Sequence, residues 1–295
     1  MKKAFIILIS IMLLFTGCSP VAKTDNKDKL SIVTTIFPLY DFARAVGGDQ
    51  VNIKLLVDPG TEVHSFDPAP SDVAAIYDAD IFFYIGGESD TWVDSILSDV
   101  NVNAISLIGF VEPLMEDEHE EEDEHIWTSP QNAVILLRKI CDSIIEADND
   151  NKSYYKNNCD AYANSITKAD GEIRQVSDGA RNKFILCADR FPFKYLTEYY
   201  GIQYEAAFGG CAISTDISIK TMNRLIETIK NKNIGTVYCT EMSNRNIANA
   251  LRAEMGVNVI ELHSAHNVTK ADFENGVTYV DIMYRNKEAL GGGMS

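Results

Sequence analysis

Four of the five histidines in this chain stand in loops or at the ends of predicted strands, namely His64, His125, His263 and His266. In parallel α/β sheets, ligands collect beyond the carboxyl ends of the strands. Imidazoles that reach such strand ends from distant parts of the chain are suitable donors for a transition-metal site between two lobes. The pattern indicates metal binding, and the alternative is that each histidine is an ordinary surface or core residue.

The segments around these histidines alternate between strand and helix signals. β-branched runs at 30–35 and 51–57 predict buried strands, and helical patterns follow them at 38–46 and 71–77. The same alternation returns over residues 184–290. Strands that alternate with helices form parallel sheets covered on both faces. We therefore expect an α/β protein with two parallel-sheet lobes and a cleft between them.

Residues 151–178 give the clearest single element, a long amphipathic helix. Its apolar side chains fall at alternating steps of four and three residues, which produces one continuous stripe. The residues on this stripe are Tyr155, Cys159, Tyr162, Ile166, Ala169, Ile173 and Val176. From the rise of an α-helix, its length would be about 40 Å. A helix of that length between two lobes predicts a rigid spine rather than a flexible hinge.

The N-terminal end has the pattern of an export signal. Lys2 and Lys3 precede an apolar run that ends in Phe15-Thr16-Gly17-Cys18. This ending resembles the lipobox of bacterial lipoproteins, which implies lipidation of Cys18; the alternative is an ordinary cleaved signal with an incidental cysteine. The expected organisation is a signal peptide at 1–17, a lipidated linker at 18–29, an N-terminal lobe at 30–147, the spine helix at 148–180 and a C-terminal lobe at 181–295.

Composition restricts the partners. The formal net charge of −17 argues against nucleic acid and anionic lipid headgroups. Beyond the signal region, no apolar segment approaches the roughly 20 residues that a transmembrane helix needs. Five cysteines follow Cys18 and form no CxxC metal clip. Cys141 and Cys159 lie on the apolar faces of consecutive helices, so they are the best disulfide candidates; otherwise all five are small buried hydrophobes.

Residues 116–124 interrupt the pattern with eight acidic residues around His119. Such a block repels itself, so it predicts a solvated loop. Two interpretations remain open. The loop could attract cations through its field, with His119 as a weak, transient ligand, or it could be a flexible segment with no defined site.

Several motifs resemble the zinc and manganese substrate-binding proteins of bacterial ABC importers. They are the segments 34–40 (TTIFPLY), 56–68 (LVDPGTEVHSFDP), 79–84 (ADIFFY) and 125–130 (HIWTSP). The similarity covers nearly all of the chain beyond the signal region, and the string PGTE-x-H-x-F-x-P is highly specific. The resemblance implies two α/β lobes joined by one long helix, with the metal in the cleft, which agrees with the predicted spine.

The resemblance also implies metal ligands. His64 and His125 match the first two ligands of the family, both from the N-terminal lobe. The third family ligand, a His or Glu, precedes a helix containing Phe-x-Tyr. In this chain Phe193-Lys194-Tyr195 sets the register and places Arg190 at that position. An arginine cannot ligate a cation and would repel one.

The rest of the ligand set stays open. The fourth family ligand aligns with His263, and His266 follows three residues later. Asp189, next to Arg190, and Glu241, at the end of a predicted strand, are carboxylate candidates, and either could instead pair with Arg190. The expected ligands are His64, His125 and His263, completed by His266 or Asp189, with Glu241 as a further candidate.

A nitrogen-rich site favours zinc, whereas oxygen-rich sites favour manganese. The resemblance implies a monomeric, lipid-anchored extracytoplasmic protein that captures zinc, or else manganese, and delivers it to an ABC permease. The alternatives are a zinc-holding surface adhesin and a zinc enzyme, but the chain contains no HExxH, G-x-S-x-G or Walker motif. The rigid spine predicts small rearrangements on loading. The need for neutral imidazoles predicts weaker binding below a pH of about 6.5.

Overall fold

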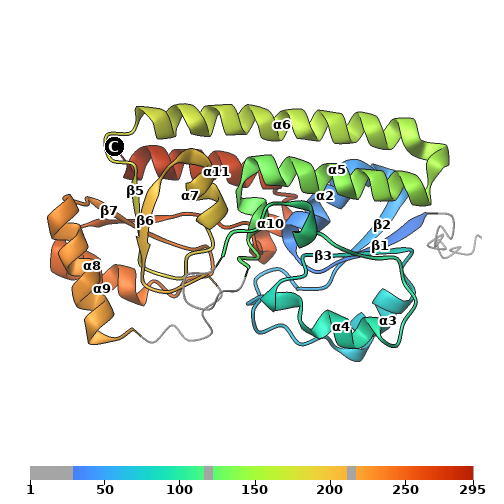
Figure 1. The fold of residues 1–295 in the computed structure, drawn as a ribbon, viewed down its shortest axis with the longest axis horizontal. Helices are drawn as coiled ribbons and strands as arrows, with labels where there is room; N and C mark the ends of the chain where they lie inside the picture. Colours follow the sequence, from blue (N-terminus) through green and yellow to red (C-terminus); the bar gives the residue numbers. More distant parts are fainter. Residues whose placement is uncertain (1–28, 116–121, 211–216, 295) are drawn as a thin grey trace, which may run out of the picture.

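The computed structural model describes residues 29–115, 122–210 and 217–294, in which two parallel four-stranded sheets form the framework (Figure 1). The first sheet contains β1 (Leu30–Thr34), β2 (Val51–Leu55), β3 (Ile81–Tyr84) and β4 (Ala104–Ser106), in the order β2-β1-β3-β4. The second contains β5 (Phe184–Cys187), β6 (Gln203–Ala206), β7 (Thr236–Cys239) and β8 (Asn258–Glu261), in the order β6-β5-β7-β8.

The two sheets share one topology. In each, the first strand lies between the second and the third, as in the pairing of Ile32 with Ile53 on one side and Ile81 on the other. The direction of progression through the sheet therefore reverses next to β1 and next to β5. Ligands of open α/β sheets bind beyond the carboxyl ends of the strands at such switch points. In the C-terminal half, the loops that follow β5, β7 and β8 carry all the metal-ligand candidates, which are Asp189, Glu241, His263 and His266.

Helices cover both sheets. They are α2 (Phe37–Gly47), α3 (Pro70–Tyr77), α4 (Trp92–Leu97), α5 (Pro130–Ala147), α6 (Lys152–Gly179), α7 (Lys194–Tyr200), α8 (Ile219–Lys232), α9 (Asn246–Met255), α10 (Lys270–Glu274) and α11 (Tyr279–Gly293). Short 3₁₀ turns are η1 (Gly48–Gln50), η2 (Glu88–Asp90), η3 (Ile108–Phe110), η4 (Ile126–Thr128) and η5 (Asn149–Asn151).

The long helix α6 confirms the predicted spine. It runs along one side of the molecule over both lobes, with α5 beneath one half and α11 beneath the other (Figure 1). Its buried side chains repeat at steps of four and three, as an amphipathic helix requires. They are Tyr155, Cys159, Ala163, Ile166, Ala169, Ile173 and Ser177. The predicted fold class, two α/β lobes joined by one long helix, is therefore correct.

Two cysteines face each other across α5 and α6. Cys141 and Cys159 are both buried, and the Cys141 thiol donates to the Tyr155 carbonyl oxygen at 3.8 Å. The structure holds them as free thiols, as it does the buried Cys187 and Cys239, so it does not contain the disulfide that the sequence suggested. Cys18 and Cys211 lie outside the described residues.

One helix was not predicted. The segment α10 has five residues, too few for an apolar period, and it starts where the Thr269 side chain accepts a hydrogen bond from the Asp272 N–H. The next helix, α11, begins at Tyr279. Thr278 and Asp281 form a reciprocal capping box there, which fixes the first turn.

None of the helices in the described parts of the chain combines the length and the apolar character that crossing a membrane would take.

A buried carboxylate joins the spine helix α6 to α2 and α11. Asp41 of α2 is fully buried and accepts hydrogen bonds from Arg44, from the Tyr162 hydroxyl of α6 and from the Tyr279 N–H at the start of α11. Burial raises the pKa of Asp41, while Arg44 and the hydrogen bonds oppose that rise. Arg44 also donates to the carbonyl oxygens of Gly276 and Val277. The three helices therefore depend on one satisfied polar cluster.

We expect Asp41→Ala to lower the free energy of unfolding by about 3 kcal/mol, since it leaves buried donors without an acceptor. Denaturant unfolding of the metal-free protein measures this loss. The matched control is Asp160→Ala, which removes an ion pair with Arg138 on the exposed surface of α6 and should cost less than about 1 kcal/mol. Equal losses in the two variants would contradict this interpretation.

Candidate metal centre

Three imidazoles meet in one cavity. One ring nitrogen from each of His64, His125 and His266 lies within 4.8 Å of the others. The ring centroids are 5.9 Å apart for His64 and His125, and 5.1 and 5.2 Å from His266 to each of them. The cavity around them has about 420 Å³ of space, including the solvent at its mouth. Zinc–nitrogen bonds of about 2.0–2.1 Å require the rings to approach by only on the order of 1 Å.

His64 is oriented by a hydrogen-bonded chain from the neighbouring loop. Its Nδ1 lies 3.0 Å from the Ser89 hydroxyl, and that hydroxyl contacts the Glu124 carboxylate. A carboxylate only accepts, so Ser89 uses its single proton on Glu124 and accepts from His64. Nδ1 of His64 therefore carries the proton, and Nε2 has the lone pair that a metal would bind.

His125 is oriented by a direct carboxylate contact. Its Nδ1 lies 3.0 Å from Oδ1 of Asp123, which also accepts the His125 backbone N–H at 2.8 Å. Asp123 and His125 are both fully buried. This carboxylate–imidazole pair places the proton on Nδ1 and leaves Nε2 as the donor toward a metal.

His266 reaches the same point from the other lobe through a strained turn. Ala265 has a φ of +61°, which is uncommon for a residue with a side chain. The His266 N–H donates to the Ser264 hydroxyl, and the ring packs against Trp127 with centroids 4.8 Å apart. The turn therefore directs this imidazole back across the interface between the lobes.

Backbone contacts hold this turn against the N-terminal lobe. Trp127 donates from its indole N–H to the Ser264 carbonyl at 2.8 Å. Asn267 donates to the carbonyl oxygens of Asp58 and Thr61 at 2.9 and 3.0 Å. The Gly60 N–H donates to the Val268 carbonyl at 2.8 Å. The loop that carries His266 is thus fixed directly to the loop that carries His64.

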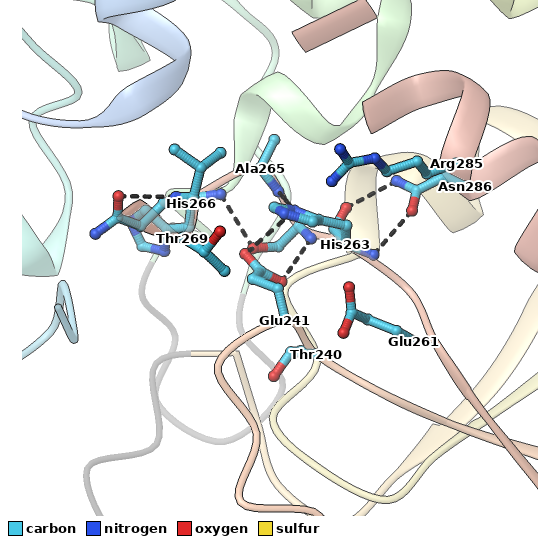
Figure 2. Close-up of polar contacts among 12 residues, drawn as sticks. Thr240, Glu241, Glu261, His263, Ala265, His266, Thr269, Arg285 and Asn286 are labelled. Atoms are coloured by element: carbon cyan, nitrogen blue, oxygen red, sulfur yellow. Dashed lines mark hydrogen bonds and ion pairs between the residues drawn. The ribbon is translucent and has the colours of Figure 1, made fainter. Parts of the chain in front are cut away.

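His263, which was preferred over His266 from the sequence, does not join the cluster. Its backbone N–H and carbonyl pair with the Asn286 side chain of α11 at 2.8 and 2.7 Å, and its Nδ1 accepts the Ala265 N–H at 3.0 Å. Figure 2 shows His263 on the Asn286 side of the loop and His266 on the opposite side. Ala265, which lies between them and has a left-handed backbone conformation, reverses the direction of the chain. This reversal is not visible in the sequence.

The two carboxylate candidates also serve the loops rather than the cluster. Asp189 accepts from the Arg190 N–H and from the Thr240 hydroxyl. Both oxygens of Glu241 accept from Ser264, from its N–H at 2.9 Å and its hydroxyl at 2.6 Å (Figure 2). Neither belongs to the group of ligand atoms found among the described residues. Glu241 does line the cavity, and it supports the turn that carries His266.

Arg190 lies on the wall of the cavity, but its partner differs from the expected ones. Its Nη1 lies 3.0 Å from Oε2 of Glu62, rather than pairing with Glu241 or through its side chain with Asp189. Glu62 is two residues before His64, so the ion pair links the loop of one lobe to the loop of the other. Neither Glu62 nor Ser89 is indicated as a site residue by the sequence pattern, although Glu62 stands in the specific PGTE string.

Contrary to the prediction of a solvated loop, the last two residues of the acidic run are buried. Asp123 and Glu124 are 0% and 1% exposed, because they support His125 and His64 from behind. A run of charged residues predicts an exposed segment, unless a neighbouring residue can pair with one of the charges. Here the neighbouring His125 is such a residue. Residues 116–121, with His119, lie outside the described residues.

Two of the three imidazoles, those of His64 and His266, are held neutral. Burial, aided by the charge of His125 and opposed by Glu124 and Glu62, lowers the pKa of His64 from 6.5 to about 4. Burial also lowers the pKa of His266 well below its usual range, and the charges of His64, His125 and Arg190 add to the effect. Neutral imidazoles can bind a cation without first releasing a proton, so the cluster is ready for metal at neutral pH.

We expect acid to destabilise the metal-free protein between a pH of about 6.5 and about 4, because the unfolded chain then binds a proton at His64 that the folded chain does not. The stabilisation is complete above the higher pH. From pH 7 to pH 5 the loss from His64 should be about 2 kcal/mol. Denaturant unfolding of the wild type and His64→Gln at both pH values measures it.

The His64→Gln variant should lose about 2 kcal/mol less than the wild type over this interval. Burial raises the pKa of Asp90 to about 7, which has the opposite effect on stability, but both proteins contain Asp90 and its contribution cancels. Identical losses in the two proteins would show that His64 is not held neutral.

Ser89→Ala removes the group that fixes the His64 tautomer. We expect metal affinity to fall about tenfold, the order of magnitude for a residue that orients a ligand. Competitive titration with a chelator measures the change. Ser95→Ala is the matched control, since the exposed Ser95 hydroxyl donates to the Trp92 carbonyl within α4 and has no other hydrogen bond among the described residues, and it should leave affinity unaltered.

Comparisons with known proteins agree with this arrangement. The family described as zinc-uptake complex component A, periplasmic (ZnuA), matches residues 32–293. The zinc-binding lipoprotein AdcA of Streptococcus pneumoniae R6 is 30% identical over 307 residues, which cover 98% of this chain and 60% of that protein. The high-affinity zinc uptake system protein ZnuA of Bacillus subtilis 168 is 30% identical over 305 residues, which cover 96% of this chain and 95% of that protein.

Solved structures show the same fold. The Zn(II)-bound ZnuA-like domain of S. pneumoniae AdcA has a TM-score of 0.79 and 31% identity, over 90% of this chain and 99% of that domain. The metal-dependent lipoprotein YcdH of B. subtilis has a TM-score of 0.81 and 27% identity, over 90% of this chain and all of that one. Since the family matches all but the ends of the sequence, the chain belongs to the ZnuA family of zinc-uptake components.

Proposed function

We propose that this protein captures Zn²⁺ outside the cytoplasmic membrane and delivers it to an ABC importer. The observation that carries the proposal is the convergence of His64, His125 and His266 from both lobes, with ligand atoms within 4.8 Å. The zinc named in the relatives AdcA and ZnuA supports the same cargo. The proposed task is capture and release, with no chemical change of the cargo.

The donor set favours zinc over manganese. Three neutral imidazoles supply borderline nitrogen ligands, whereas Mn²⁺ prefers carboxylates, carbonyls and water. Each nearby carboxylate is already engaged by a hydroxyl, a backbone N–H or Arg190. A Mn-bound relative shares the fold at 17% identity, a level that does not transfer its metal.

The site requires little movement to close. The backbone contacts between the two lobes fix the loops of His64 and His266 to each other, and α6 spans both lobes. A ligand set organised before binding loses little conformational entropy on binding. We therefore propose local adjustment of side chains on loading, without a wide rotation of the lobes.

The proposed setting follows from the N-terminal signal and the family. Lipidation at Cys18, which lies outside the described residues, would anchor a monomer on the outer face of the cytoplasmic membrane, next to its permease. Such an anchor raises the local concentration of the protein at the transporter. Laminin-binding relatives share the fold at 24% identity, which supports no adhesive function for this chain.

The contrast between two neighbouring histidines tests the proposal. We expect His266→Ala to lower zinc affinity by roughly 100-fold or more, because it removes one of three ligands. We expect His263→Ala to stay within roughly tenfold of the wild type, because the His263 ring contacts the Ala265 N–H and Glu241, which support the turn of His266, and lies outside the ligand cluster. Competitive titration of the fragment beginning after Cys18 measures both, with circular dichroism to confirm folding.

The same titration with Mn²⁺ tests the metal. Zinc should outcompete manganese in the wild type, and metal analysis should find one zinc per chain. A larger loss in His263→Ala than in His266→Ala would overturn the proposed ligand set. The absence of any tightly held metal would overturn the proposed function.

A further inference from the structure

Arg190 places a positive charge where a metal site would be expected to have a ligand or a negative charge. It lines the same cavity as the three imidazoles, and its charge is felt at both His64 and His266. Its Nη1 contacts Glu62, but its Nε is buried and finds no hydrogen-bond acceptor among the described residues. A buried donor without an acceptor is costly and marks a position where a ligand could bind.

The described part of the chain supplies three metal donors and not the fourth that zinc prefers. Glu62 also lines the cavity, but its Oε2 is held by Arg190 and its Oε1 by the His64 N–H at 3.4 Å. Asp189 and Glu241 are held by loop N–H and hydroxyl groups. Among the described residues, therefore, no further carboxylate or imidazole is placed to be the fourth donor, and a ligand from solution could take this position.

The charges of the loaded site favour an anion over water as that donor. Zinc and the guanidinium would bring three positive charges into a cavity whose metal ligands are all neutral. An anion between them would be attracted to both. The guanidinium is planar and donates two parallel hydrogen bonds, a geometry that fits the two oxygens of a carboxylate.

We propose that zinc binds in this cavity together with a small carboxylate anion, which completes the metal coordination and is held by Arg190. This inference rests on the proposed function, since it names a co-ligand of the same metal. Glu62 is 42% exposed, so its carboxylate can turn into solvent when the anion replaces it on Arg190. The exchange swaps one carboxylate for another on the guanidinium, and no covalent bond changes.

Acetate is the probe. Zinc affinity of the fragment beginning after Cys18 is measured by competitive titration with and without acetate, at constant ionic strength set with perchlorate and in a buffer that carries no carboxylate. We expect acetate to raise zinc affinity of the wild type about tenfold. With Co²⁺ in place of zinc, acetate should also change the visible absorption bands, which report directly on the metal's ligands.

Three variants complete the test. Arg190→Gln should bind zinc more tightly than the wild type without acetate, because a repelling charge is gone, and should gain nothing from acetate. Glu62→Gln should keep the gain, because it only removes a competitor for Arg190. Arg138→Gln, which removes an exposed guanidinium on α5, controls for net charge and should behave as the wild type.

The outcomes separate this inference from the proposed function. Tight zinc binding that does not respond to acetate, with unchanged cobalt bands, would overturn the co-ligand and leave zinc capture intact. A collapse of zinc affinity in Glu62→Gln would overturn it in favour of Glu62 as the fourth ligand. If the wild type binds no zinc under either condition, the proposed function itself fails.

Discussion

The whole site depends on the hydrogen bonds that join the loop after β8 to the N-terminal lobe. Trp127, Asn267 and Gly60 make these contacts through backbone partners. Each is worth about 1 kcal/mol on its own, but together they set the distance between imidazoles from different lobes. Without them, His266 would belong to a separate lobe, and three histidines far apart in the sequence would have no fixed relation.

The second feature that organises the site is the burial of its imidazole rings, which disfavours their charged form. Two imidazoles have carboxylates behind them, Asp123 directly and Glu124 through Ser89. The carboxylates fix ring orientation and offer negative charge, while burial lowers the pKa of His64 and of His266. Desolvation favours the neutral imidazole, and a nearby carboxylate favours a cation at the ring. A divalent metal satisfies both conditions, because it brings charge to the site without protonating the ring.

The sequence predicts the framework better than the site. Alternating strands and helices and the stripe of α6 are local periodicities, so the two sheets and the spine follow from them. His64 and His125 also follow, since a specific string surrounds each. The choice of His266 over His263 depends on one left-handed residue, Ala265, which no local propensity indicates. The burial of Asp123 and Glu124 depends on contacts between distant loops. Composition alone predicts instead that these two residues belong to an exposed run of charges.

The spine has a consequence for how an importer would distinguish the loaded protein from the empty one. If α6 and the contacts between the lobes hold the outline constant, little shape difference is available for a docking partner to detect. What would change is the electrostatic potential of the cavity, because a divalent cation adds charge to a space lined by Glu62 and Arg190 as well as by the three histidines. The importer would then distinguish the loaded protein by its charge at short range. This recognition would be sensitive to ionic strength and independent of the relative orientation of the lobes.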